Sequence, residues 1–298
     1  MSPILSDSSG THREPTTVTG TPPALVMQSY GLSDTGRQRS NNEDHFLVAE
    51  LAKALRVRHS NLLPAQTQYS GERGYLLIVA DGMGGHQAGD QASAVAVETI
   101  DEFVLNTFKW FFHLKGPDEE NVLTSFQNAL HQADARILEM AARHPALYGM
   151  GTTLTMAYCV GNEAFIAHVG DSRCYLFRDG RLQLWTRDHT LVAEMVRRGG
   201  LAPEDAARHR LRHVILNAVG GNTPGMDIEI HRFDLHPGDT LLLCTDGLTE
   251  MVPDDRIAKA LAASDDLRTV CERLVAAANE AGGKDNITVI VARFDAAG

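Results

Sequence analysis

Acidic residues follow several apolar segments of this sequence, each beside a glycine or an asparagine. The five places are Asn42-Glu43-Asp44, Asp81-Gly82, Gly170-Asp171-Ser172-Arg173, Thr245-Asp246-Gly247 and Lys284-Asp285-Asn286. One acid at the end of a strand is usually a turn former, because its short side chain bonds its own backbone. Five such positions, three of them after long apolar runs, predict instead that buried strands deliver carboxylates to a common rim.

Carboxylates gathered at one rim repel each other unless cations lie between them. Oxygen ligands favour magnesium or manganese over zinc, which prefers histidine and cysteine. Two such ions could bridge a water, lower its pKa and present a hydroxide in line with a phosphorus centre. Arg39, five residues before Asp44, is a candidate anion clamp because a guanidinium can hold two phosphate oxygens at once.

The segment Val79-Ala80-Asp81-Gly82-Met83-Gly84-Gly85-His86 combines a carboxylate with three glycines. In this scheme Asp81 bridges two cations, and Gly82 lets its carbonyl approach a metal because no side chain obstructs it. Gly84 and Gly85 then permit a sharp turn into the helix that follows.

Other interpretations of these motifs fail on residue type. Gly84 to Gly89 has the spacing of a P-loop, but Asp90-Gln91 stands where lysine and serine or threonine are required, and Gln87 replaces the third glycine of a dinucleotide fingerprint. Gly170-Asp171-Ser172-Arg173 is not a nucleophile elbow. His209 and His213 have the spacing of a zinc helix but lack a third ligand in the motif.

The elements that must position these residues indicate an α+β fold. Strands are expected at 25–33, 45–50, 74–80, 152–160, 163–169, 172–178, 181–186, 226–233, 240–244 and 287–294, and helices at 92–111, 122–140, 254–262 and 266–281. The four strands of 152–186 predict an antiparallel meander, whose Asp179-Gly180 link is typical of a type I′ hairpin. Residues 190–221 are expected to be mostly helical. No regular strand–helix alternation indicates a parallel sheet.

Composition narrows the class of protein. The 298 residues carry a net charge of −11, which disfavours a nucleic-acid surface. Four widely spaced cysteines predict buried, reduced thiols and a cytoplasmic location, and no segment predicts a membrane helix or an export signal. Residues 1–24 are rich in Ser, Thr, Pro and Gly, so we expect a disordered arm before one domain at 25–296.

Taken in order, these motifs resemble the metal-dependent serine/threonine phosphatases of the protein phosphatase 2C type, in particular the compact bacterial members. The resemblance runs from about Gln28 to Phe294. Its segments are Gly36-x-x-Arg39-x-x-Asn42-Glu43-Asp44, the stretch from Val79 to His86, Gly151-Thr152-Thr153, Gly170-Asp171-Ser172-Arg173, Asp188-His189-Thr190, Thr245-Asp246-Gly247-Leu248 and Asp285-Asn286-Ile287-Thr288.

The resemblance implies a four-layer αββα sandwich of two antiparallel β-sheets flanked by helices, with two manganese or magnesium ions at one edge. It assigns Asp81, Asp246 and Asp285 to the first ion, and Glu43, Asp81 and the Gly82 carbonyl to the second. It also implies that Asp44 orients metal-bound water, that Arg39 clamps phosphate, and that Asp171 joins Asp246 at a weaker third ion. Residues 190–221 match the flap beside the cleft of those enzymes.

Two positions depart from the family pattern. Met83 replaces a histidine that in animal and plant members is a candidate general acid, so the proton source is open. The polar segment 51–73 is longer than in the compact bacterial pattern and is expected to be a solvated loop, with a docking surface as the alternative.

The implied function is the hydrolysis of phosphoserine and phosphothreonine in proteins, which reverses serine/threonine kinase signalling. The expected partners are such kinases and their substrates. The alternatives are a catalytically silent metal-binding module that recognises phosphoproteins, and a phosphatase of an anti-sigma-antagonist type partner.

Overall fold

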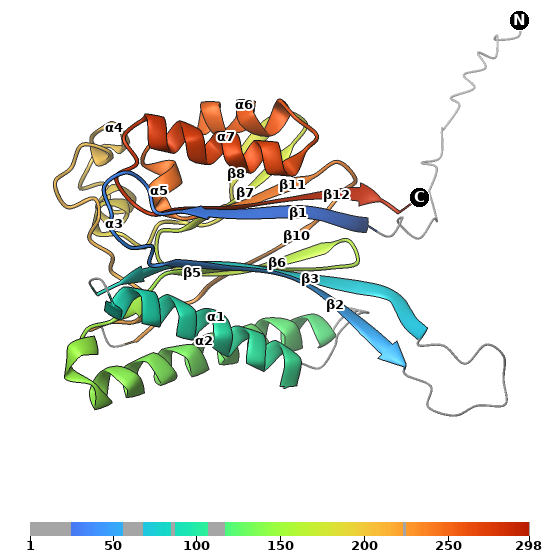
Figure 1. Ribbon diagram of the computed structural model, residues 1–298, viewed down its shortest axis with the longest axis horizontal. Helices are drawn as coiled ribbons and strands as arrows, with labels where there is room; N and C mark the ends of the chain where they lie inside the picture. The colour runs from blue at the N-terminus through green and yellow to red at the C-terminus, as the bar shows by residue number, and fades with distance from the viewer. Residues whose placement is uncertain (1–24, 56–67, 85–86, 107–116, 223–224, 298) are drawn as a thin grey trace, which may run out of the picture.

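The structure is a computed structural model, and it describes residues 25–55, 68–84, 87–106, 117–222 and 225–297. Two antiparallel sheets stack face to face, and helices cover the outer face of each (Figure 1). The predicted four-layer αββα sandwich is therefore confirmed. The predicted arm at 1–24 lies outside the described residues.

One sheet has five strands and the other has seven. The five-stranded sheet has the order β1-β12-β11-β7-β8, and the seven-stranded sheet has the order β10-β6-β5-β3-β4-β9, with β2 also paired to β3. The strands are β1 (Leu25–Asp34), β2 (Asp44–Leu55), β3 (Gln68–Met83), β4 (Gly151–Thr152), β5 (Leu154–Val160), β6 (Glu163–Val169), β7 (Arg173–Arg178), β8 (Arg181–Leu184), β9 (Val219–Gly220), β10 (Glu229–Asp234), β11 (Thr240–Cys244) and β12 (Ile287–Ala296).

Helices cover the two outer faces and the flap. The seven-stranded sheet carries α1 (Gln87–Asn106) and α2 (Pro117–Arg143), and the five-stranded sheet carries α6 (Asp254–Ala262) and α7 (Leu267–Glu280) (Figure 1). Shorter helices are η1 (Pro145–Leu147), α3 (Leu191–Arg197), α4 (Pro203–Ala206) and α5 (Asp246–Thr249).

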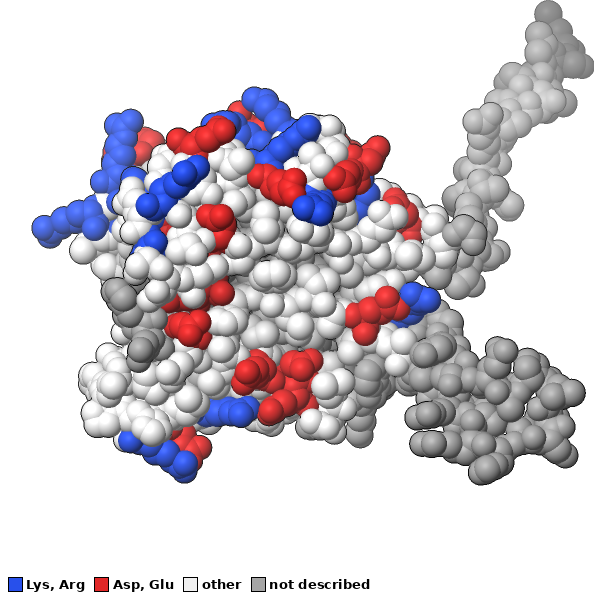
Figure 2. Space-filling model, viewed as in Figure 1, with Lys and Arg blue, Asp and Glu red and all other residues white. Residues whose placement is uncertain are grey.

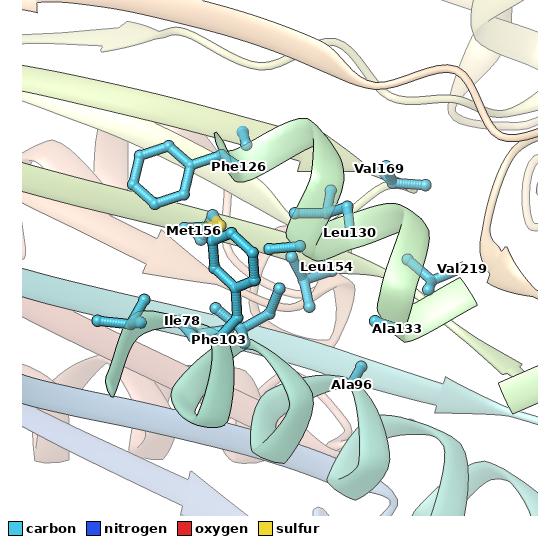
Figure 3. Packing of buried hydrophobic residues seen from close by; sticks show 14 of the residues in the cluster. Ile78, Ala96, Phe103, Phe126, Leu130, Ala133, Leu154, Met156, Val169 and Val219 are labelled. Atoms are coloured by element: carbon cyan, nitrogen blue, oxygen red, sulfur yellow. The ribbon is translucent and has the colours of Figure 1, made fainter. Parts of the chain in front are cut away.

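Three apolar clusters hold these layers together. The first lies between α1, α2 and the seven-stranded sheet, where Phe103, Phe126 and Met156 meet (Figure 3). The second lies between the sheets and includes Leu77, Leu243 and Ile290, and the third joins the five-stranded sheet to α6 and α7. Because successive residues of a strand face opposite sides, Leu76 belongs to the first cluster and Leu77 to the second.

The strand directions bring the acidic motifs to one end of the sandwich. Strands β1, β3, β6 and β11 run toward that end, and β2 and β12 start from it (Figure 1). Asp44 pairs directly with Asp81 across β2 and β3, and Asp34 pairs with Ile287 across β1 and β12. The motifs that follow or precede these strands therefore share one edge.

Two expectations, for segments 152–186 and 190–221, need correction. The four strands of 152–186 do not form one meander, because the chain passes from the seven-stranded sheet to the five-stranded sheet between Val169 and Arg173. The predicted hairpin at Asp179-Gly180 is confirmed, with φ of 51° and 73°. Segment 190–221 contains only two short helices: α3 ends before Gly199, whose φ is +72°, and Pro203 starts α4.

The segment 51–73 is not entirely a loop. Strand β2 continues to Leu55, and β3 begins at Gln68. The remainder of the segment, and the docking surface considered there, lie outside the described residues.

Candidate metal centre

Asp81 is fixed by its backbone at the end of β3. Its N–H donates to Thr153 Oγ1 at 3.0 Å. Its carbonyl accepts from Thr152 Oγ1 at 2.8 Å and from the Thr153 N–H at 2.9 Å. Both polar backbone groups of Asp81 are therefore satisfied by β4 and the residue that follows it.

Four carboxylates act on Asp81 electrostatically. Burial raises the pKa of Asp81 well above its usual range, and the charges of Asp44, Asp246, Asp171 and Asp285 raise it further. The structure thus brings together acids from distant parts of the sequence, from Asp44 to Asp285.

Asp44 is buried with its two carboxylate oxygens in different surroundings. Its Oδ2 accepts from Thr245 Oγ1 at 2.8 Å and from Thr288 Oγ1 at 2.7 Å. Its Oδ1 has no hydrogen-bond partner in the described part of the chain. Burial raises the pKa of Asp44 to about 7, although the two threonine hydroxyls act in the opposite direction.

Glu43 and Gly82 meet where the first turn of α1 approaches the strands. The Gly82 N–H donates to the Glu43 carbonyl at 3.2 Å. A Cβ on Gly82 would lie 2.2 Å from the Gly89 carbonyl oxygen and 2.7 Å from the Glu43 carbonyl oxygen. The site needs glycine at position 82 because three backbone segments converge there.

Asp246 and Asp285 complete the acidic edge from the five-stranded sheet. Asp246 begins α5 directly after Thr245, and its Oδ1 is buried without a hydrogen-bond partner among the described residues. Burial raises the pKa of Asp246, and the charges of Asp171 and Asp285 raise it further. Asp285 precedes β12, and its Oδ2 accepts from Arg39 Nη2 at 2.6 Å.

Arg39 lies against this edge with about half of its side chain exposed. Its hydrogen bond to Asp285 is the main cause of its raised pKa, and the charges of Glu43 and Asp81 raise it further. The guanidinium is therefore charged, accessible to solvent and adjacent to the carboxylates.

Asp171 enters the edge from the turn between the two sheets. Its side chain is buried, and burial raises its pKa to about 7. Gly170, which precedes it, has φ of +112°, and a Cβ there would lie 2.6 Å from the Thr153 side chain. All eight residues predicted for the site thus lie at one edge of the fold.

The chemistry of this edge fits hard divalent cations. Two buried carboxylate oxygens, on Asp44 and Asp246, lack hydrogen-bond partners within the described part of the chain, and an unpartnered buried charge is costly without a counter-ion. The gathered donors are carboxylate and carbonyl oxygens, which magnesium and manganese prefer.

Two clusters that contain histidine occur among the described residues, and one of them shares Asp246 with the acidic edge. One joins His213, Asp246 and Glu250, and the other joins His168, His189 and Glu229. The zinc alternative at His209 and His213 is not supported, because His209 Nδ1 accepts from the Leu211 N–H at 3.2 Å while His213 Nδ1 lies 2.8 Å from Glu250.

A cavity of about 460 Å³ extends from the acidic edge to the flap. Asp171 and Asp246 line one side, and Val192, Pro203 and Arg212 line the other. Basic side chains also gather at the end of the molecule that carries α3 and α4 (Figure 2). The flap therefore forms one wall of the space that a substrate would enter.

Several supporting residues were quoted within the motifs but received no role from sequence reasoning. Thr245 and Thr288 hold Asp44. Asn286 accepts from the Glu43 N–H at 2.8 Å and donates to the carbonyls of Thr35 and Asn41. The sequence shows that these polar residues lie at the ends of apolar strands, which could have marked them. Their hydrogen-bond partners could be assigned only from the fold.

The comparison with known proteins agrees with the geometry. Residues 65–290 match the sequence profile described as Protein phosphatase 2C. The serine/threonine phosphatase stp of Listeria monocytogenes serotype 4b is 35% identical over 240 residues, which cover 80% of this chain and 92% of that protein.

Two solved structures show the same arrangement of layers. The serine/threonine phosphatase PstP/Ppp of Mycobacterium tuberculosis has a TM-score of 0.73 and 32% identity, covering 90% of this chain and 99% of that one. The catalytic domain of PstP in complex with two manganese ions has a TM-score of 0.71 and 31% identity, covering 91% of this chain and 99% of that one.

Among the described residues of the present chain, no helix has the length and apolar character needed to cross a membrane.

Proposed function

Because the chain belongs to the protein phosphatase 2C family, we propose that its acidic edge is the site at which phosphoserine and phosphothreonine in proteins are hydrolysed. The protein is a metal-dependent serine/threonine phosphatase that uses manganese or magnesium, and its substrates are phosphoproteins. The observation that carries the assignment of the site is the pair of buried, unpartnered carboxylate oxygens on Asp44 and Asp246.

The proposed ligands divide between two ions and a weaker third. Asp81, Asp246 and Asp285 would hold the first ion, and Glu43, Asp81 and the Gly82 carbonyl would hold the second. Asp171 would join Asp246 at the third. When bound, the cations neutralise the carboxylates and acidify a water for attack at phosphorus.

The chain's own residues then orient the reactants. Arg39 would donate two parallel hydrogen bonds to phosphoryl oxygens, because its side chain is half exposed and adjacent to the acids. Asp44 would accept a hydrogen bond from the attacking water through Oδ1, while Thr245 and Thr288 hold Oδ2.

The leaving serine or threonine oxygen requires a proton, and Met83 cannot supply one. His189 has both ring nitrogens in hydrogen bonds within the fold, and His86 lies outside the described residues. We propose solvent as the donor. The basic limb of the pH profile of turnover should then be the same for wild type, His86→Ala and His189→Ala, and a shifted limb in either variant would contradict this.

We also propose that the phosphoproteins include serine/threonine kinases and their substrates, and that the protein acts in the cytoplasm. The second proposal rests on the four cysteines, all of which are buried as free thiols, as is usual in reducing compartments.

Hydrolysis of an aryl phosphate and of a phosphothreonine peptide tests the assignment. We expect turnover with manganese or magnesium, none with chelator, and a loss of at least about a hundredfold in Asp246→Asn. Asp265→Asn is the matched control, because that side chain is fully exposed and should leave turnover unchanged. Binding of the phosphopeptide without turnover under every metal would favour the catalytically silent module instead.

A further inference from the structure

His189, which lies between β8 and α3, forms hydrogen bonds through its backbone N–H, its carbonyl and its ring. Its N–H donates to the Gly170 carbonyl at 2.7 Å, and its Nδ1 accepts from the Gly170 N–H at 3.2 Å. The two residues therefore hold each other reciprocally. The same Nδ1 lies 2.9 Å from Asn217 Nδ2, and the His189 carbonyl accepts from the Leu216 N–H at 2.8 Å.

These partners fix the position of the imidazole proton. Nδ1 faces the backbone N–H of Gly170, which can only donate, so Nδ1 must be the acceptor and the proton lies on Nε2. Nε2 then donates to Glu229 Oε2 at 3.2 Å. Glu229 is buried, which raises its pKa, but hydrogen bonds from His189 and His231 prevail and hold that pKa at about 2. The acceptor of the Nε2 proton is therefore a carboxylate.

The neighbouring ring of His168 indicates that these residues form a hydrogen-bonded network rather than a metal site. His168 packs against His189 with ring centroids 4.8 Å apart. Its Nδ1 bonds Thr155 Oγ1 at 2.8 Å, and its Nε2 bonds the Arg187 carbonyl at 3.0 Å. Both imidazoles thus have both nitrogens in hydrogen bonds, so neither ring offers a free nitrogen lone pair to a metal.

Gly170 connects His189 to the acidic edge. Asp171 follows directly, and Ser172 Oγ lies 2.8 Å from Thr153 Oγ1. Thr153 in turn bonds both the N–H and the carbonyl of Asp81. A path therefore runs from His189 through the turn that carries Asp171 to Asp81, and its links are the His189 ring and the hydroxyls of Ser172 and Thr153.

His189 also lies where the two ends of the flap meet. It directly precedes Thr190, whose Oγ1 caps α3 by accepting from the Ala193 N–H at 3.2 Å. Leu216 and Asn217 belong to the returning end of the flap, and both bond to His189. One side chain and its backbone therefore hold the beginning and the end of the flap beside the turn of Asp171.

We propose that His189 is a positioning residue that holds the turn of Asp171 and both ends of the flap as one unit, so that cation binding at Asp171 and placement of the flap are coupled. This inference rests on the proposed function only through the role of Asp171.

Two conservative variants separate the contacts of His189. In His189→Asn the amide oxygen occupies the position of Nδ1 and can still accept from Gly170 and Asn217, but no donor of residue 189 reaches Glu229. In His189→Gln the amide nitrogen occupies the position of Nε2 and can still donate to Glu229, but the acceptor for Gly170 is lost. His231→Asn is the matched control, since His231 contacts the other oxygen of Glu229 without touching Gly170.

The first readout is amide hydrogen exchange of the metal-free protein, which does not depend on catalysis. His189→Gln should raise exchange about tenfold at the Gly170 N–H, which loses its acceptor, and in the adjoining turn 171–173, as expected when a hydrogen bond in a largely buried network is lost. His189→Asn and His231→Asn should exchange like the wild type in these segments.

The second readout is calorimetric titration with Mn²⁺, together with the kinetics of aryl phosphate hydrolysis. His189→Gln should weaken the lowest-affinity Mn²⁺ site about tenfold, lower kcat and leave KM for the aryl phosphate nearly unchanged, whereas His189→Asn restores wild-type values. Equal exchange and equal Mn²⁺ binding in His189→Asn and His189→Gln would overturn the inference. If the wild type binds Mn²⁺ but hydrolyses nothing, the proposed function fails while the exchange data still decide the role of His189.

Discussion

Replacing Asp44 by asparagine should stabilise the metal-free protein while it impairs catalysis. Asp44 is buried, its Oδ1 has no hydrogen-bond partner in the described chain, and burial raises its pKa from 3.8 to about 7. Asparagine keeps the shape of the side chain and can still accept from Thr245 and Thr288 through its amide oxygen, but it carries no charge to bury.

The direction in which the free energy of unfolding changes with pH follows from the number of protons bound by the folded and unfolded states. The pKa of Asp44 is higher in the folded than in the unfolded state, so the folded state binds more protons and the free energy of unfolding falls as pH rises from about 4 to about 7. The shift of about three units corresponds to about 4 kcal/mol lost above pH 7. Asp44→Asn lacks this loss, so its stability relative to the wild type should increase by about 2 to 3 kcal/mol between pH 5 and pH 7.5.

Urea unfolding in the presence of chelator measures this difference. Comparing the two proteins at each pH cancels the contribution of His168, whose pKa burial lowers to about 4. Saturating Mn²⁺ should reduce the difference, because nearby cations favour the ionised form of Asp44. Asp265→Asn, at a carboxyl that is exposed to solvent, is the control for an Asp-to-Asn substitution outside the acidic edge. The reasoning is refuted if Asp44→Asn is the less stable protein at pH 7.5 without metal, or if the difference is the same at pH 5.

Three further results are expected. Gly82→Ala should lower the free energy of unfolding by about 3 kcal/mol or more, because its Cβ would lie 2.2 Å from the Gly89 carbonyl oxygen; Gly200→Ala, where the nearest atom is 3.5 Å away, should change it by less than about 0.5 kcal/mol in the same urea titration. Arg39→Lys should reduce kcat/KM for a phosphopeptide about tenfold to a hundredfold, as expected when a two-pronged guanidinium contact is lost, and wild-type kinetics in this variant would remove Arg39 from phosphate binding. The thiols of Cys159, Cys174, Cys244 and Cys271 are buried and should react with a chromogenic disulfide only after unfolding, so that rapid labelling of the native protein would contradict their burial.

The spacing of apolar and turn residues in the sequence was sufficient to predict most strands and helices of the fold. Strand β11 and helix α6 begin and end where periodicity and turn residues predict, because each has a clear apolar period and defined flanking residues. The pattern failed between Val169 and Arg173, where a glycine–aspartate pair resembles a hairpin but leads the chain to the other sheet. Sheet membership depends on which partner strand is available, and single-strand patterns carry no such information.

The flap shows a second limit of sequence patterns. Residues 190–221 contain many helix-forming residues, but the structure forms only α3 and α4. The rest of the segment is held by bonds to distant backbone, such as that from the Leu216 N–H to the His189 carbonyl. Such contacts cannot be seen as periodicity.

The sequence by itself determined which residues could do the chemistry, because carboxylates at strand ends beside glycine or asparagine are visible as residue types and spacing. The family resemblance then supplied their expected roles. Only the tertiary structure decided how these carboxylates are held: Thr245 and Thr288 on one oxygen of Asp44, Thr153 on the backbone of Asp81, and His189 on the turn of Asp171. The physical reason is that a hydrogen bond depends on distances between atoms a few ångströms apart, and these partners come from strands that meet only after both sheets have formed.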